Sequence, residues 1–368
     1  MKPHKPDKGL IITIFFLVIL GLAILSSASA VISQQKYGNL YYYLTHQLIY
    51  GVIAGLIIFF ICQKINYKIW KKLSLVIFFG SLILMVLVFI PSLGYKHAGA
   101  QRWLNFGPIS IQPSEFLKLG LVIYLAAFFS KSTFRQDKKR NQRINTLIPF
   151  LAIIVLVGGL VALQSDAGTL GIVAIIGFII YFLSGAKLYQ WILVLVCYAV
   201  GFFVLIKFFP YRMARFIVFL NPSIDTQGIS YQINQALLSI GSGGILGVGL
   251  GHSQQRYNYL PEPMGDSIFA IFAEEMGFIG ALILLVLFMI LAFKGFKIAK
   301  KAPDDFGKLL AIGITSWLII QAFINIAAIT GLIPLTGVPL PFVSYGGSAL
   351  FSVLAGVGIL VNISKHTQ

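Results

Sequence analysis

The stretch Tyr259–Gly280, YLPEPMGDSIFAIFAEEMGFIG, runs from a polar loop directly into an apolar segment. Acidic residues are scarce in this chain, which has 11 Asp and Glu among 368 residues. Four of them fall within this stretch: Glu262, Asp266, Glu274 and Glu275. A solvated loop with Asp266 as the N-cap of the following helix is one explanation. A loop that needs negative charge for binding or chemistry is the other, and the rest of the chain decides between them.

The composition places the chain in a lipid bilayer. Hydrophobic residues make up 58% of the sequence, charged residues 11%, and the mean hydropathy is +0.89. Apolar runs of about 20 residues, the length that spans a bilayer as a helix, recur along the chain. We therefore expect one all-α, polytopic membrane domain over residues 1–368, with about ten transmembrane helices. The predicted spans are 9–32, 47–63, 73–90, 114–130, 147–164, 169–186, 189–208, 267–293, 309–330 and 346–363.

Lysine and arginine predict the orientation, because positively charged loops stay in the cytoplasm. Most of the 28 Lys and Arg residues fall in the terminal segments and in the loops on one side of the predicted spans. Both termini are therefore predicted to be cytoplasmic. Three longer loops, 91–113, 209–266 and 331–345, then lie outside, and the longest of them connects spans seven and eight. Function usually concentrates in such loops.

The net charge of +17 also raises nucleic acid as a partner. The cytoplasmic loop bias beside an anionic leaflet accounts for most of this charge, and no basic and aromatic module accompanies it. Cys62 and Cys197 fall inside predicted spans without metal-ligand spacing, so we interpret them as small buried residues. The sequence therefore predicts no nucleic-acid partner, and it leaves metal binding unknown.

The first outer loop ends in a helix start that carries two opposite charges. Pro113 stops any preceding helix, Ser114 can cap the next one, and Glu115 suits its first turn. Glu115 and Lys118 are three residues apart and share one helix face. A structural ion pair is one interpretation. An ionisable residue at membrane depth is also a functional candidate.

Two further sites carry charge near the outer surface. Asp166 lies in the tight turn Gln164–Thr169 between predicted spans five and six, where it is either an N-cap or a functional carboxylate. Arg212 and Arg215 follow the seventh predicted span at a spacing that would aim both guanidinium groups one way. Snorkelling of these arginines at the interface is the alternative.

The remaining outer segments are rich in glycine and proline. The run Tyr231–Gly251 lacks the Gly-Lys-Ser/Thr ending of a nucleotide loop, so we expect a short amphipathic helix followed by flexible backbone at the interface. In the 331–345 loop, three prolines fix the path of the chain. This loop, which contains Ser344, is either a rigid connector or a substrate contact.

Together, the outer loops gather carboxylates and cations on one face of the predicted bundle. The carboxylates are Glu115, Asp166, Glu262 and Asp266, and the cations are Arg102, Lys118, Arg212 and Arg215. Arg and Lys bind diphosphate oxygens through charge-assisted hydrogen bonds, and a nearby carboxylate can accept a proton from a hydroxyl. The set suits an enzyme that acts on an anionic lipid, and a transporter could use the same set.

Five motifs in a fixed order carry a family resemblance. They are Arg102-Trp103 with Gln112–Glu115 and Lys118, then Gln164–Thr169, Leu260–Asp266, Glu274–Gly277 and Pro341–Ser348. In this order they resemble the SEDS family (shape, elongation, division and sporulation) of FtsW, RodA and SpoVE, over nearly the whole chain. The resemblance implies a peptidoglycan glycosyltransferase that polymerises lipid II on the outer face of the bacterial cytoplasmic membrane. It also implies a class B penicillin-binding transpeptidase as partner, with other division or elongation membrane proteins.

The resemblance further implies roles for individual residues. The family's essential loop aspartate falls on Asp266, the predicted general base, although Met264-Gly265 replaces the polar pair that usually precedes it. Substrate-binding roles are predicted for Arg102, Glu115, Lys118, Asp166, Arg212, Arg215, Glu262 and Ser344. A sugar C4 hydroxyl would attack an anomeric carbon, and undecaprenyl diphosphate would leave with inversion. The resemblance fixes no cofactor and leaves room for Mg²⁺ or Mn²⁺ at the diphosphate.

Two other classes of function remain open at this stage. A flippase for the same lipid would need a polar path across the whole membrane, whereas the ionisable residues of the predicted spans gather on one face. A non-catalytic scaffold of the wall-synthesis complex is the other class. Within the polymerase class, the run from Asn221 to Gly277 favours the division-type branch slightly over the elongation-type branch.

Overall fold

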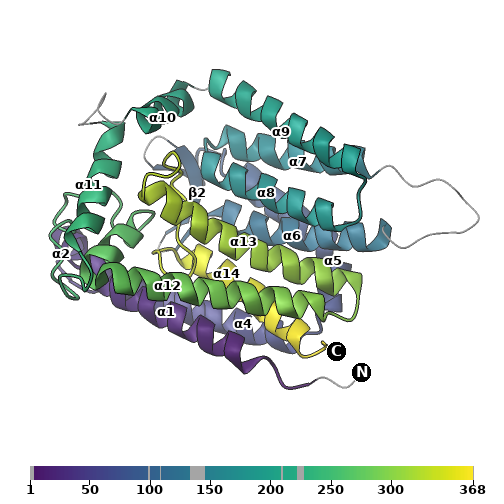
Figure 1. Cartoon of the computed structure of the whole chain (residues 1–368), viewed down its shortest axis with the longest axis horizontal. Helices are drawn as coiled ribbons and strands as arrows, with labels where there is room; N and C mark the ends of the chain where they lie inside the picture. The colour runs from purple at the N-terminus through teal and green to yellow at the C-terminus, as the bar shows by residue number, and fades with distance from the viewer. Residues whose placement is uncertain are drawn as a thin grey trace, which may run out of the picture.

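The computed structural model is a bundle of helices (Figure 1). It describes residues 4–97, 100–107, 109–132, 146–208, 210–221 and 228–367. The cationic loop predicted in the cytoplasm after the fourth span lies mostly outside these residues. The helices are α1 (Lys8–Ala28), α2 (Ala30–Tyr37), α3 (Tyr42–His46), the π-helix η1 (Gln47–Ile53), α4 (Ala54–Lys64), α5 (Lys68–Leu87), α6 (Pro113–Ser132), α7 (Leu147–Leu163), α8 (Ala167–Leu183), α9 (Leu188–Phe208), α10 (Pro210–Leu220), α11 (Ile229–Ser242), α12 (Ile268–Lys300), α13 (Asp305–Ile329) and α14 (Gly347–Ser364).

The predicted spans coincide with helices. Among the described residues, seven helical segments are long and apolar enough to cross a membrane. The other three predicted spans coincide with the shorter apolar helices Leu147–Leu163, Ala167–Leu183 and Leu188–Val204. The chain is therefore a multi-pass membrane protein, and the count of ten spans stays a prediction. Its two termini lie at the same end of the bundle, as the charge pattern predicted (Figure 1).

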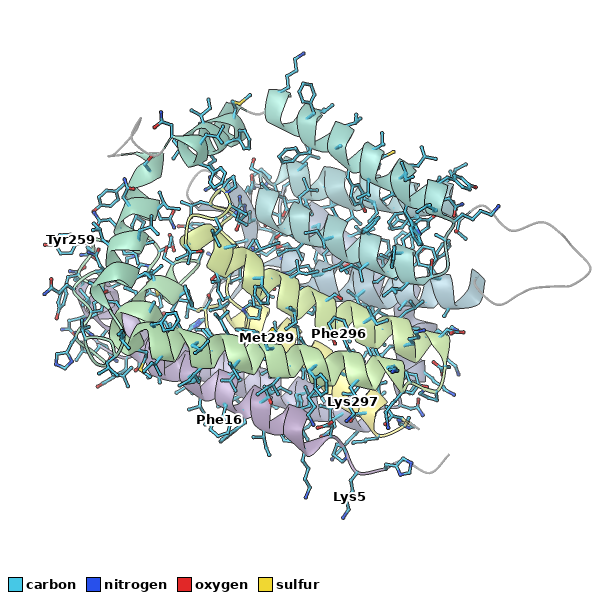
Figure 2. All side chains as sticks on the ribbon, viewed as in Figure 1. Lys5, Phe16, Tyr259, Met289, Phe296 and Lys297 are labelled. Carbon is cyan, nitrogen blue, oxygen red and sulfur yellow. The ribbon has the colours of Figure 1, made fainter. Side chains whose placement is uncertain are left out.

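The helices divide into a central and a peripheral set. In α6, α13 and α14, between 72% and 83% of the apolar window is buried, against 28% in α5 and α12. Phe16 of α1 and Met289 and Phe296 of α12 are exposed on the outside of the bundle (Figure 2). Since hydrocarbon is as apolar as these side chains, the peripheral set has the surface that a bilayer would cover. The central set supports the predicted outer loops, which lie at the end of the bundle away from the two termini (Figure 1); this end is called the outer end below.

The outer end also contains structure that the sequence did not predict. Three short strands, β1 (Gly94–His97), β2 (Ala100–Phe106) and β3 (Ile109–Ile111), form an antiparallel sheet in the order β1-β2-β3. Tyr95 pairs with Trp103 and Leu104 with Ile111. Within the described residues, the fold is all-α apart from this small sheet in the first outer loop.

Helix α12 is interrupted at Gly277, where φ is 64° and ψ is −167°. The glycine-rich segment 243–251 packs into this break and forms backbone hydrogen bonds on both sides of it. Val248 N donates to Glu274 O (3.0 Å), and Phe278 N donates to Gly244 O (2.9 Å). A Cβ atom on Gly277 would lie 2.3 Å from the nitrogen of Gly247, so only glycine fits. The segment expected to be flexible backbone at the interface is instead held inside the helix break.

Candidate functional site

Asp266 lies two residues before the first helical residue of α12, where three outer segments meet. Its side chain is half-buried. Gln232 of α11 approaches it, with Nε2 at 3.4 Å from Asp266 Oδ1 and at 3.0 Å from Ser267 Oγ. From α13, Asn325 Nδ2 donates to the Asp266 carbonyl at 2.8 Å. A Cβ atom on Gly337 would lie 3.7 Å from Asp266 Oδ2, so the backbone of the 331–345 loop borders the carboxylate.

The 331–345 loop also holds the two residues before Asp266. Ser344 Oγ donates to the Gly265 carbonyl at 2.7 Å, and Tyr345 N donates to the Met264 carbonyl at 2.8 Å. These bonds use backbone carbonyls, which every residue type supplies. Support for Asp266 therefore does not depend on polar side chains at positions 264 and 265. Ser344 acts here as a connector, and its substrate-binding role stays a prediction.

The surroundings of Asp266 change its acidity. Burial, together with the nearby negative charge of Glu262, raises the pKa of this carboxyl from 3.8 to about 6. The hydrogen bond from Gln232 and the positive charge of Arg215 act in the opposite direction on the pKa. A carboxylate with a pKa near the working pH is ionised often enough to accept a proton and basic enough to hold it. Asp266 thus has the acidity of a general base.

Glu262 forms the turn that precedes Asp266. Its φ of 49° lies in the left-handed region, which is uncommon for a residue with a side chain. Its carbonyl accepts hydrogen bonds from Gly265 N (3.0 Å) and Ser267 N (3.3 Å). The side chain is exposed at the outer surface. Glu262 is therefore open to a substrate, as its predicted role requires.

Arg215 approaches the site from α10. Its guanidinium donates to the Leu335 carbonyl at 2.8 Å and lies within electrostatic range of Asp266. An apolar pocket of about 130 Å³ opens beside it, between α10, α11 and residues 330–335. Arg212 also belongs to α10, but its side chain lies outside the described part of the structure. Arg215 therefore lies where it would attract a negatively charged group bound near Asp266.

Glu115 and Lys118 form a buried ion pair at the start of α6. Lys118 Nζ lies 2.7 Å from Glu115 Oε1 and 2.6 Å from Gln321 Oε1 of α13. Gln321 Nε2 in turn donates to the Pro339 carbonyl at 2.9 Å. The Lys118 side chain is 0% exposed and that of Glu115 1%. The structure shows the pair as a support of the 331–345 loop, and contact of either residue with a substrate stays a prediction.

Arg102 and Asp166 are joined through the turn between α7 and α8. The Arg102 guanidinium of β2 donates to the carbonyls of Gln164 and Ser165. Asp166 caps α8, because it accepts from Thr169 N (3.1 Å) and from Thr169 Oγ1 (2.8 Å). The N-cap interpretation of Asp166 is thus confirmed, and substrate contact by either residue stays untested.

That turn also packs against the loop beside Asp266. A Cβ atom on Gly168 would lie 2.2 Å from Val338 Cγ2 and 2.8 Å from the Thr336 carbonyl. The outer segments around Arg102, Glu115 and Asp166 therefore all reach the 331–345 loop, which borders Asp266. The gathering of outer loops predicted from the sequence is present in the structure.

The other two acids of the opening stretch anchor the segment that leads to Asp266. Glu274 accepts from Ser239 Oγ (2.8 Å), Ser253 Oγ (2.5 Å) and Gln254 N (2.9 Å). Glu275 accepts from Ser27 Oγ of α1 at 2.5 Å. Both side chains are buried. Half of the acidic cluster therefore holds the 243–267 segment in place.

Sequence reasoning missed the amide side chains. Gln232, Gln321 and Asn325 each connect a helix to the loops around Asp266. For Gln321 and Asn325 the signal was an amide side chain inside an apolar span, where an unpaired amide would be costly; no such signal marks Gln232. Among the described residues no group of three or more His, Cys, Asp or Glu side chains could hold a metal ion.

Comparison with known proteins shows which family the chain belongs to. The family model for the FtsW, RodA and SpoVE cell cycle proteins matches residues 8–368. The chain belongs to this family. A relative from Bacillus subtilis (strain 168), stage V sporulation protein E, is 39% identical over 370 residues, which cover 100% of this chain and 99% of that protein. A probable peptidoglycan glycosyltransferase FtsW from Trichlorobacter lovleyi is 38% identical over 97% of this chain and 93% of its own length.

Solved structures of the FtsW/RodA/SpoVE family have the same fold. RodA, the rod shape determining protein of Thermus thermophilus, matches with a TM-score of 0.71 and 27% identity, over 99% of this chain and 98% of its own. A chain from a structure described as a peptidoglycan synthase complex that coordinates polymerization and crosslinking matches with a TM-score of 0.78 and 26% identity. That match covers 98% of this chain and 97% of the other chain.

Proposed function

We propose that the chain is a peptidoglycan glycosyltransferase that polymerises lipid II at the outer face of the cytoplasmic membrane. One observation carries this proposal: Asp266, with a pKa raised to about 6, is held at the outer end of the bundle by α11, α13 and the 331–345 loop. Relatives named as probable peptidoglycan glycosyltransferases, similar over nearly the whole chain, support it.

The chemistry needs one base and compensation of a departing negative charge. The Asp266 carboxylate takes the proton from the C4 hydroxyl of one lipid-linked disaccharide. At the same time, the oxygen of that hydroxyl bonds to the anomeric carbon of a second lipid-linked disaccharide. The bond from that carbon to the diphosphate oxygen breaks, and the electron pair leaves with undecaprenyl diphosphate. Arg215 lies near enough to attract the departing charge. A Mg²⁺ ion commonly binds through phosphate oxygens and one or two carboxylates, so the exposed Glu262 carboxylate would be available to hold such an ion at the diphosphate, where the ion would offset the departing negative charge.

The placement of buried charge favours an enzyme over a transporter. A flippase would need polar groups along a path from one leaflet to the other. The Asp, Glu, Lys and Arg residues buried in the described helices, namely Glu115, Lys118, Glu274 and Glu275, belong to the networks that support the outer loops. A scaffold without activity would not need a half-buried carboxylate with a raised pKa, because isolating such a charge from water destabilises the folded state.

A transpeptidase is the partner that this proposal implies. The similar chain from the peptidoglycan synthase complex supports pairing with a protein that crosslinks the glycan, which we expect to be a class B penicillin-binding protein. Other division or elongation membrane proteins would join the same assembly. Similarity to proteins named FtsW and SpoVE, at 38% and 39% identity, supports our preference for a role in cell division over one in elongation.

A polymerisation assay tests the proposal. The purified chain, with its transpeptidase partner and lipid II in detergent or liposomes, should give glycan polymers that a muramidase digests. Asp305, the first residue of α13 at the opposite end of the bundle, offers a matched Asp305→Asn control that keeps activity. Absence of polymer from the folded complex, with lipid II moving between leaflets instead, would favour the flippase class.

A further inference from the structure

Six aromatic rings gather at the outer end of the bundle, where α2, α3 and η1 meet the end of the 331–345 loop. We define the tyrosine cluster as Tyr37, Tyr42, Tyr43, His46, Tyr50 and Tyr345. The rings of Tyr37 and Tyr42 stack with centroids 3.7 Å apart and planes 14° apart. The Tyr43 ring lies edge-on to both of them at 5.6 Å.

Helix length places Tyr37 beyond the hydrocarbon core. Belts of tyrosine sit at the level of the lipid head groups. Helix α1 has 21 residues, enough at 1.5 Å per residue to cross the hydrocarbon core of roughly 30 Å by itself. Helix α2 continues for 8 residues beyond this, about 12 Å at the same rise, and Tyr37 is its last residue. Tyr37 is 50% exposed, and Tyr42, the first residue of the next membrane-spanning segment, is 37% exposed, so both rings keep open surface at this end of the bundle.

Exposed amide side chains lie on the same outer segments as these rings. Asn258 Nδ2 donates to Gln35 Oε1 at 2.9 Å, and both side chains are exposed. Asn39 lies between α2 and α3, where its side-chain oxygen accepts from Tyr41 N at 2.9 Å. Hexose rings present C–H groups on one face, which pack on the electron-rich faces of aromatic rings, and they carry hydroxyls at their edges, which bond amides. The surface combines both kinds of group.

The tyrosine cluster is connected to the segment that carries Asp266. The rings of Tyr43 and Tyr345 lie 5.2 Å apart, and Tyr345 Oη is hydrogen-bonded to His46 Nδ1 at 3.0 Å. Tyr345 N also donates to the Met264 carbonyl, two residues before Asp266. The Tyr43 hydroxyl lies close enough to the Glu262 carboxylate to interact electrostatically with it. A sugar bound on the cluster would therefore lie beside the proposed reaction site.

We propose that the tyrosine cluster is a sugar-binding surface that holds rings of the amino-sugar chain next to Asp266. The proposal rests on the proposed polymerase function and adds a binding site to it. A chain held on this surface stays near the site between additions, so the length of the polymer depends on the exposed ring faces of Tyr37 and Tyr42.

The length of the glycan product tests this proposal. The double variant Tyr37→Ala/Tyr42→Ala should make chains several-fold shorter than wild type on denaturing gels with labelled lipid II. Tyr37→Phe/Tyr42→Phe keeps both ring faces and should restore the length. Tyr95→Ala removes an exposed tyrosine of β1 outside the cluster and should match wild type. Equal lengths from all four proteins would overturn the proposal, whereas absence of polymer from wild type would contradict the polymerase function itself.

A binding measurement covers the case in which the double alanine variant does not fold. Chitotetraose, a β-linked oligomer of N-acetylglucosamine without lipid or diphosphate, serves as the probe in saturation-transfer NMR. The wild-type protein should transfer saturation to the ring protons of the sugar, and the single variant Tyr37→Ala should reduce this transfer while Tyr95→Ala does not. No transfer from wild type, or equal transfer from Tyr37→Ala, would overturn the proposal.

Discussion

The amide nitrogen of Asn325 in α13 donates to the Asp266 carbonyl at 2.8 Å, and the same nitrogen donates to the Val338 carbonyl at 2.7 Å. One buried side chain thus joins the Asp266 segment to the 331–345 loop. Because backbone position fixes where the carboxylate points, Asn325 sets the geometry of the proposed site without touching the reacting groups.

Replacing Asn325 by leucine should weaken both the fold and the reaction. The change leaves two backbone carbonyls without their donor, and each unpaired buried group costs about 1–3 kcal/mol. We expect a lower Tm and a large loss of polymerisation. Thr315→Val on the same helix is the control, since Thr315 Oγ1 bonds a carbonyl of its own helix. An Asn325→Leu protein as stable and as active as the Thr315→Val protein would show that the bridge is dispensable.

The pH dependence of the reaction should follow Asp266. Its carboxyl, with a pKa of about 6, loses its basic form as the pH falls below this value, so activity should decline there and level off above it. Glu262→Gln removes a negative charge that raises the pKa, so the midpoint should move to lower pH. The initial rate of polymerisation against pH measures both. A midpoint that stays in place in Glu262→Gln would argue against Asp266 as the group that titrates.

The buried pair on α6 should behave as a structural unit. Neutralising Lys118 alone leaves the Glu115 charge buried without a partner, which typically destabilises a protein by about 3–5 kcal/mol. The charge swap Glu115→Lys/Lys118→Glu should recover part of the stability and of the polymerisation that each single change removes. Thermal unfolding and the glycan assay on the four proteins measure this coupling. Recovery of stability without any recovery of activity would instead support a direct role of Lys118 with the substrate.

Cysteine labelling tests the orientation on which the site depends. After replacement of Cys62 and Cys197, a cysteine at Gln254 in the outer segment should react with an impermeant maleimide in intact cells. A cysteine at Lys301, between α12 and α13, should react only after the membrane is opened. Both side chains are exposed in the structure, so burial would not hide either of them. The reverse pattern would place Asp266 on the cytoplasmic side.

The sequence predicted those features that depend only on residues close together in the chain. Apolar runs gave the positions of the spans, the i, i+3 spacing of Glu115 and Lys118 gave the ion pair, and the turn at Asp166 gave the N-cap. Each of these depends on residues within one helical turn. Asp266 was identified by the sequence motifs that the chain shares with a family, and not by the physical properties of its neighbours in the sequence.

The remaining features depend on partners far away in the chain. An Asn in an apolar run shows that the amide needs a partner, but it does not show that Asn325 bonds residues 266 and 338. In the same way, the break at Gly277 exists because the 243–251 segment fills it, and that segment reads as flexible when taken alone. The tyrosine rings of α2 and α3 contact one another locally, but their connection to the Asp266 segment runs through Tyr345, which is distant in the sequence.

The rate of lipid II polymerisation by Asp266→Asn tests the central claim most directly. Asparagine keeps the size of the side chain and an oxygen that can accept a hydrogen bond, but it cannot take the proton. General-base catalysis contributes roughly 10²- to 10⁴-fold, so a folded, partner-bound Asp266→Asn protein should lose at least about 100-fold in rate while Asp305→Asn keeps it. A folded Asp266→Asn protein that polymerises lipid II at the wild-type rate would contradict the proposed mechanism.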